Sequence, residues 1–71
     1  MTEIRAEIAA TVWKVEVEAG ATVGEDDELI ILESMKMEIP VVAGAAGTVA
    51  TIHVGPDDRV NEGDLLVTLE P

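Results

Sequence analysis

The sequence predicts an all-β fold: a flattened barrel or sandwich of two four-stranded antiparallel sheets with pseudo-twofold symmetry. Three observations predict it. The apolar residues are mostly Val, Ile, Leu and Ala, with Trp13 as the one aromatic, and glycines punctuate the chain. Apolar and polar residues alternate over short segments, as in strands. A repeat divides the chain into two similar halves. At 71 residues, we expect one domain spanning 1–71.

The repeat appears when the chain is shifted by 37 residues against itself. ATVWKVEV (10–17) then falls on GTVATIHV (47–54), and the register continues without a gap to Glu33 on Glu70. About ten of twenty-five pairs are identical, where unrelated chains would give roughly one or two. Convergence of two hairpins on similar patterns is the alternative, but we interpret the match as an internal repeat.

Each copy is expected to begin with an alternating strand. In the first, TVWKVEV, alternation separates two faces: Thr11, Trp13, Val15 and Val17 on one, and Val12, Lys14 and Glu16 on the other. In the second copy the expected inward residues are Thr48, Ala50, Ile52 and Val54, with Thr51 and His53 outward. Trp13 aligns with Ala50, breaks the symmetry, and is interpreted as a core or rim plug.

Polar turns at 18–27 and 55–64 follow these strands, and short apolar strands at 29–33 and 65–70 come next. Between the copies, 38–42 is expected to pair with 29–33, so the chain reverses at Met35-Lys36. Tight hairpins favour Gly, Asn or Asp, and the other loops use Gly20, Gly24, Gly55 and Gly63. The central hairpin has none of these residues, and such local departures are expected at functional sites.

The net charge of −11 excludes several classes of function. An acidic surface repels nucleic acid and anionic membranes. The chain has no cysteine, its N-terminus shows no signal-like apolar region, and its longest apolar run, LIIL, is too short to span a bilayer. We therefore expect a soluble cytoplasmic protein that is a monomer by itself.

Other candidate sites are weak. EDDE (25–28) and PDD (56–58) lack the spacing of a calcium loop and are interpreted as solvated turns. His53 has no cysteine or second histidine with which to share a metal. Lys36 taken alone could be an ordinary hairpin lysine, and Met35 and Met37 could be core filler.

Taken together, ESMKME (33–38) resembles the biotin attachment motif of biotin carboxyl carrier proteins, usually E-A-M-K-M with a biotinylated lysine. The resemblance to a biotinyl/lipoyl domain, a barrel-sandwich hybrid, extends over roughly 9–70. Ser34 replaces the usual alanine, and RAEIAATV replaces a Pro- and Gly-containing start. The chain looks like a free-standing biotin/lipoyl attachment protein.

This resemblance implies a carrier module and not an enzyme. Biotin protein ligase would biotinylate Lys36, and the biotin arm would carry carboxylate between biotin carboxylase and carboxyltransferase. The matching family glutamate helps the ligase choose its substrate, which implies that role for Glu33. Met35 and Met37 are expected to serve ligase discrimination and to contact biotin.

The residues themselves agree that Lys36 is a substrate. A lysine amine must be neutral to attack an acyl group, whereas the neighbouring Glu33 and Glu38 favour the ammonium. Two alternatives stay open: a lipoyl carrier of an oxo-acid dehydrogenase-type system, which Met-Lys-Met disfavours, and an unmodified acidic β-domain that binds a protein partner.

Overall fold

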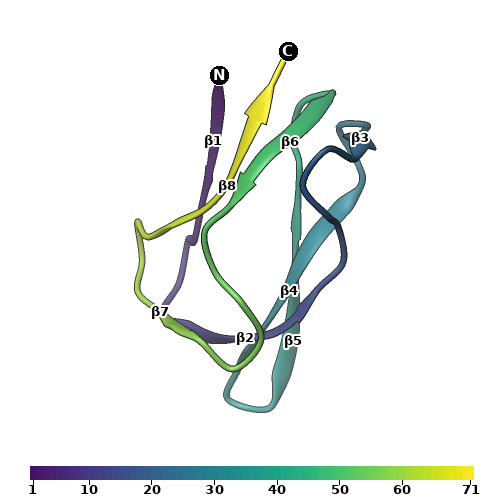
Figure 1. Cartoon of the computed structure of the whole chain (residues 1–71). Helices are drawn as coiled ribbons and strands as arrows, with labels where there is room; N and C mark the ends of the chain where they lie inside the picture. Colours follow the sequence, from purple (N-terminus) through teal and green to yellow (C-terminus); the bar gives the residue numbers. More distant parts are fainter.

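The computed structural model describes residues 1–71 as eight strands without a helix. The strands are β1 (Thr2–Arg5), β2 (Ala10–Val15), β3 (Thr22–Val23), β4 (Glu28–Ser34), β5 (Met37–Val42), β6 (Gly47–Ile52), β7 (Arg59–Val60) and β8 (Leu65–Glu70). They form two four-stranded sheets, which we call sheet A (order β1-β8-β6-β3) and sheet B (order β5-β4-β2-β7). All pairings are antiparallel, so the predicted fold class is confirmed (Figure 1).

The 37-residue repeat describes the strand pairing as well as the sequence. In sheet B, β2 pairs with β4 through Thr11↔Glu33, and in sheet A, β6 pairs with β8 through Thr48↔Glu70. Both residues of the second pair lie 37 positions after those of the first (11 + 37 = 48; 33 + 37 = 70). The two halves of the chain therefore repeat the same strand pairing, once in each sheet.

A β-bulge in each copy corrects the predicted strand faces. The register shifts between Val12 and Lys14 in β2, and between Val49 and Thr51 in β6. An extra residue reverses the alternation beyond it. Val12 and Val49 are therefore buried, at 0% and 1% exposure, although alternation placed both with the outward residues.

Of the two positions predicted for Trp13, core or rim, the core is wrong for the same reason. Trp13 is the extra residue of the β2 bulge, and its side chain is 41% exposed. Beyond the bulges the predicted strand faces are correct again. Four residues there are half-buried and pack against the core: Val15, Val17, Ile52 and Val54. The predicted outward position of His53 is also observed, since that residue is exposed.

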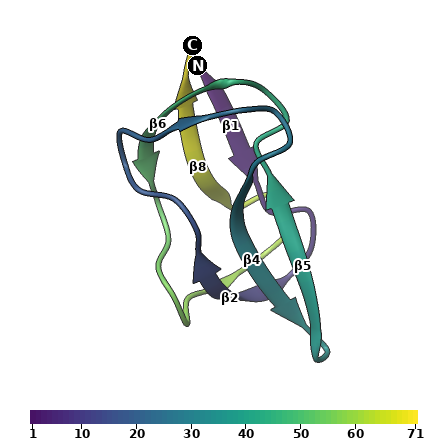
Figure 2. The same ribbon diagram turned by 90° about the vertical axis from the view of Figure 1, so that its right-hand side faces the viewer.

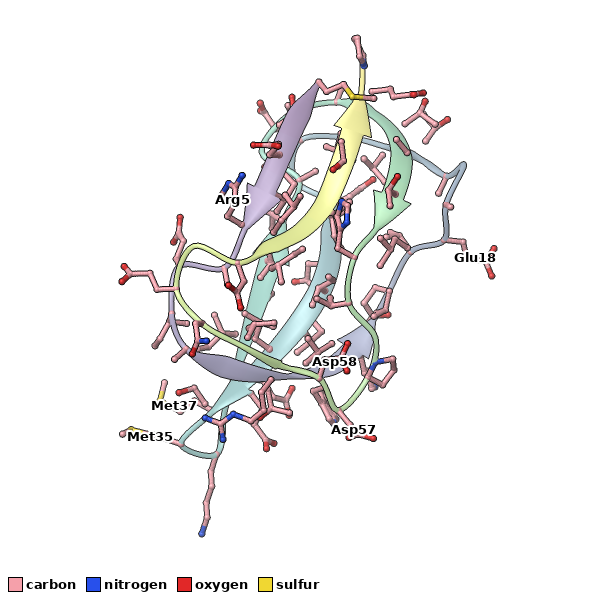
Figure 3. The ribbon with its side chains drawn as sticks, turned by 60° about the vertical axis from the view of Figure 1, so that its left-hand side comes forward. Arg5, Glu18, Met35, Met37, Asp57 and Asp58 are labelled. Atoms are coloured by element: carbon pink, nitrogen blue, oxygen red, sulfur yellow. The ribbon has the colours of Figure 1, made fainter.

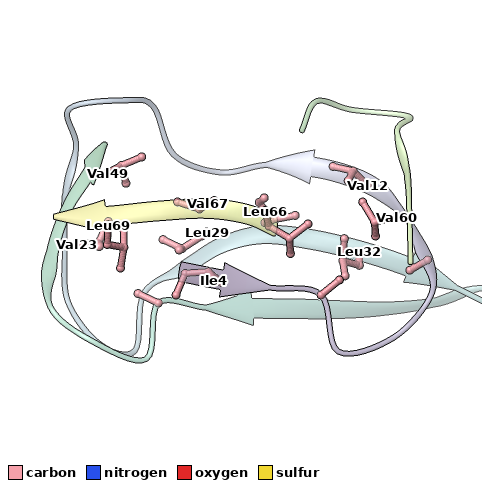
Figure 4. Packing of buried hydrophobic residues seen from close by; sticks show 14 residues of the cluster. Ile4, Val12, Val23, Leu29, Leu32, Val49, Val60, Leu66, Val67 and Leu69 are labelled. Carbon is pink, nitrogen blue, oxygen red and sulfur yellow. The ribbon is translucent and has the colours of Figure 1, made fainter. Parts of the chain in front are cut away.

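The core lies between the sheets and is purely apolar (Figure 4). Its largest members come in repeat-related pairs, such as Leu29 with Leu66 and Leu32 with Leu69. No buried side-chain polar atom lacks a hydrogen-bond partner. With no aromatic residue inside, the core is a thin layer of aliphatic side chains, which suits a domain this short.

Three strands were missed by the sequence analysis. β3 and β7 have two residues each and lie inside the segments predicted as polar turns. β1 pairs with β8 and is the repeat counterpart of most of β5, since Thr2 + 37 gives Ile39 and Arg5 + 37 gives Val42. Shifting the predicted strand at 38–42 back by 37 residues would have located β1.

The molecule is elongated, measuring 33 × 17 × 17 Å. β1 and β8 bring the two termini side by side at one end, whereas the β4–β5 hairpin projects at the other (Figure 2). The pseudo-twofold symmetry relates these two ends, because the position of the hairpin in one copy is taken by the chain ends in the other. The structure contains no helix that could span a membrane.

Candidate functional site: the β4–β5 hairpin

The β4–β5 hairpin turns on two residues, Met35 and Lys36, between the paired residues Ser34 and Met37. Both turn residues have positive φ, 53° for Met35 and 65° for Lys36. Two-residue hairpins with positive φ at both central positions are type I′ turns, which strongly prefer Asn-Gly. The reversal at Met35-Lys36 is confirmed. The turn also lacks the residues that such turns prefer, and neither Met35 nor Lys36 suits the left-handed backbone conformation it adopts.

This conformation has an energetic cost. The left-handed region costs an L-residue roughly 1–2 kcal/mol. Elsewhere the same region is occupied by Gly20, Gly44, Gly63 and Asp57, all of residue types that tolerate it. Asp57, and not the predicted Gly55, supplies the positive φ of its turn, at the position equivalent to Gly20 (57 − 37 = 20).

The hairpin extends beyond the core. Leu32↔Ile39 is the last pair with a core residue, and two more pairs follow before the turn: Glu33↔Glu38 and Ser34↔Met37. Met35 is 94% exposed and Met37 is 65% exposed, and Figure 3 shows both at the hairpin end of the molecule. The interpretation of these methionines as core filler therefore does not hold.

The Lys36 amine is free. Lys36 is exposed, and its side chain makes no hydrogen bond and no ion pair. The single ion pair of the molecule, between Arg5 and Glu3 at 2.8 Å, belongs to β1. Nothing holds the lysine stem in one rotamer, so the amine is presented at the tip of a fixed backbone.

Two carboxylates lie directly behind the tip. Glu33 and Glu38 face each other across the strands, an arrangement that is unfavourable for like charges. Both are exposed, and neither has an ion-pair partner within the molecule. The site thus has neither burial nor a neighbouring cation to activate its amine. It suits an amine that accepts a group delivered by another protein.

A row of residues missed by the sequence analysis joins the hairpin to the rest of sheet B. Arg59 of β7 pairs with Thr11 of β2, which pairs with Glu33 of β4. The row was missed because 55–64 was assigned to a turn. The repeat gave no signal for it, because Arg59 aligns with Thr22 in the other copy (22 + 37 = 59), and the strand that lies there, β3, was also assigned to a turn.

The remaining candidates behave as turn and surface residues. Asp27 and Asp58 each accept a hydrogen bond at 2.8 Å from the backbone N–H of the glycine three residues earlier. His53 Nε2 lies 2.9 Å from Thr68 Oγ1. No group of three or more His, Cys, Asp or Glu residues is arranged to hold a metal ion.

Comparisons with known proteins agree on one family. The model of the family described as "Biotin-requiring enzyme" matches residues 2–69. The "Biotinylated protein TB7.3 homolog" of Mycobacterium leprae is 48% identical over 67 residues, which cover 94% of each chain. The "Biotin carboxyl carrier protein" of Streptococcus mutans is 52% identical over 64 residues, 90% of this chain and 49% of that protein.

The fold is also similar to that of a domain in a solved carboxylase structure. The structure of the Kluyveromyces lactis urea carboxylase superposes on 97% of this chain with a TM-score of 0.92 and 32% identity. The match occupies only 6% of that much larger protein. What the two share is therefore one small β-domain, not the carboxylase as a whole.

Proposed function

Because the chain belongs to the biotin-requiring enzyme family, we propose that it is a biotin carrier, biotinylated on Lys36, that serves a biotin-dependent carboxylase. One observation supports this most: a free lysine at the tip of a type I′ turn, flanked by exposed methionines where Asn-Gly would be more stable. A purely structural hairpin has no reason to keep this residue pair.

The site fits a covalently attached biotin. Lys36 is exposed and its amine is unpartnered, so an amide bond at Nζ breaks no hydrogen bond or ion pair. The activated carboxyl would come from biotin protein ligase as biotinyl-adenylate. Nζ, once deprotonated, attacks the carboxyl carbon, and AMP leaves. The chain's own part is to present the amine and to hold the hairpin rigid.

Bound biotin would accept a carboxylate from biotin carboxylase and deliver it to a carboxyltransferase. Tethering on the exposed hairpin raises the effective concentration of biotin at both active sites. The domain, proposed as a single unit of residues 1–71 acting in the cytoplasm, is the carrier and performs neither reaction. In this proposal Glu33 identifies the hairpin to the ligase, and Met35 and Met37 contact the ligase and biotin.

The experiment is mass spectrometry of the intact protein expressed with a biotin protein ligase. The chain has two lysines, so Lys14→Arg is a matched control for Lys36→Arg. We expect one biotin adduct and an avidin signal in the wild type and in Lys14→Arg, and neither in Lys36→Arg. Circular dichroism should be unchanged in both variants, because Lys36 makes no contact with the core.

Two outcomes would contradict the proposal. An adduct of lipoyl mass in place of biotin would make the chain a lipoyl carrier, which the Met-Lys-Met sequence disfavours. A permanently unmodified Lys36, together with a stable complex from host lysate, would favour an acidic β-domain that binds a protein partner.

A further inference from the structure

The two sheets have the same backbone plan but different outer faces. In sheet B, the cross-strand row next to Arg59–Thr11–Glu33 consists of Lys14, Ile31 and Pro40. Its counterpart in sheet A, 37 positions away, is Thr51–Thr68–Glu3, which is wholly polar. The repeat therefore provides an internal reference: whatever sheet B has and sheet A lacks is not needed for the fold.

The difference is an exposed apolar surface, which we call the Trp13 face and define by Trp13, Lys14, Ile31, Pro40 and Val42. Trp13 is 41% exposed and Val42 45%, where sheet A has Ala50 and Arg5. Lys14 Nζ lies 4.4 Å from the centre of the Trp13 ring. Ile31 is only 8% exposed yet lies outside the core cluster, so its neighbours on this face cover it.

Most of the basic residues also lie on this side of the molecule. Sheet B and the β4–β5 turn contain three of the four Lys and Arg residues: Lys14, Lys36 and Arg59. They also contain three carboxylates: Glu28, Glu33 and Glu38. Their sum is zero (3 − 3), in a chain whose net charge is −11. Interface cores are depleted in charge and enriched in Trp, Met and Arg. The strands of sheet A hold only the charged residues Glu3, Arg5 and Glu70 and sum to −1 (1 − 2), so sheet B differs in its share of basic residues and not in net charge.

We propose that the Trp13 face, together with the hairpin, is the docking surface for biotin protein ligase. This inference rests on the proposed function. The ligase must bring its activated carboxyl within bonding distance of Nζ, which sits on a stem of only four carbons. Its body must therefore contact the hairpin and the adjoining sheet. A carboxylase instead meets the ring at the end of the longer biotin arm and has no such need.

The face is continuous with the tip. Ile31 and Glu33 lie two residues apart on the same side of β4, about 7 Å at the usual strand rise. The hairpin alone is small compared with the roughly 800 Å² per partner that specific interfaces bury. The Trp13 ring supplies the missing anchor. The complementary ligase surface is an apolar recess for Trp13 with a carboxylate rim facing Lys14 and Arg59.

The test is Trp13→Ala, which places in β2 the residue that the equivalent bulge of β6 already accommodates at Ala50. Thr51→Ala on sheet A is the matched control. We expect Trp13→Ala to raise the KM for biotinylation at least tenfold with kcat changed less than twofold, because Trp13 lies in the β2 bulge and not in the hairpin that carries Lys36. Thr51→Ala should leave both constants unchanged. A KM of Trp13→Ala equal to that of the wild type overturns the inference.

A second measurement does not depend on a substitution of Trp13. Trp13 is the only Trp, so 5-fluorotryptophan labelling gives one fluorine signal from this chain. Titrating labelled Lys36→Arg protein with ligase should shift that signal, and an unmoved signal overturns the docking surface. A defect of biotinylated Trp13→Ala confined to its carboxylation by biotin carboxylase would overturn it too. A wild type that is never biotinylated refutes the proposed function instead, so the two failures are distinguishable.

Discussion

At the scale of single residues, Met35 and Lys36 are both unfavourable for the stability of the fold. Both occupy the left-handed region, which the chain otherwise fills with Gly or Asp. The exposed Met35 side chain also gives up burial worth roughly 1.5–3 kcal/mol. A small domain has few kilocalories to spare, so the cost of these two residues supports the proposal that the tip serves recognition and not folding.

Replacing the turn by its preferred residues should therefore stabilise the protein. We expect the double variant Met35→Asn, Lys36→Gly to raise the free energy of unfolding by about 1–2 kcal/mol, because it relieves the strain of two left-handed residues. Urea denaturation followed by circular dichroism measures the change. The same variant should lose biotinylation entirely.

Gly20→Ala is a control that should change the free energy of unfolding in the opposite direction. Gly20 has φ of 93°, and a Cβ added there would meet no atom within 4 Å, so only backbone strain is introduced. We expect a loss of about 1 kcal/mol. A double variant no more stable than the wild type, alongside a destabilised Gly20→Ala, would show that the hairpin is not strained.

At the scale of strands, the two copies diverge at one close contact. A Cβ on Gly47 of β6 would collide with the backbone carbonyl oxygen of Glu70 on β8, whereas the equivalent Ala10 of β2 carries a Cβ and is buried. A backbone atom cannot move aside as a flexible side chain can. Glycine is therefore required at 47 in sheet A but not at its counterpart in sheet B.

We expect Gly47→Ala to lower the free energy of unfolding by about 1–3 kcal/mol, the usual cost of overpacking. Thermal unfolding of this variant should be compared with Gly24→Ala. At Gly24 the nearest atom to an added Cβ is Asp27 Oδ2, at 3.9 Å, so no loss is expected there. An equal effect of the two substitutions would refute the close-contact explanation.

Strands also show where sequence reasoning reaches its limit. The 37-residue repeat predicted the two-sheet plan and the hairpin because pairing and burial both follow it. Alternation failed at Val12 and Val49 because a bulge inserts one residue without any glycine or proline to announce it. The two-residue β3 and β7 are too short to show a period. Lys36 became a candidate because the turn that holds it lacks the Gly, Asn or Asp used by the other loops, and its role stays a prediction.

At the scale of the whole molecule, charge is distributed unevenly. Of the 15 acidic residues, ten lie in the connections between strands and five in strands (15 − 5 = 10). Only one ion pair, Arg5–Glu3, offsets them, and its side chains are half exposed. An exposed pair of this kind contributes little. Folding therefore gathers like charges that the extended chain keeps farther apart, and this repulsion opposes the compact state.

Screening should consequently stabilise the protein. Between 10 mM and 150 mM NaCl the screening length falls from about 30 Å to about 8 Å, less than the 17 Å width of the molecule. We expect the free energy of unfolding, measured with urea at each salt concentration, to rise on the order of 1 kcal/mol, the scale of a few exposed charge interactions. The triple variant Glu25→Gln, Asp26→Asn, Glu62→Gln removes three loop charges whose side chains make no hydrogen bond, and its salt dependence should be shallower. A salt dependence of the same slope in both proteins would mean that chloride or sodium acts by binding and not by screening.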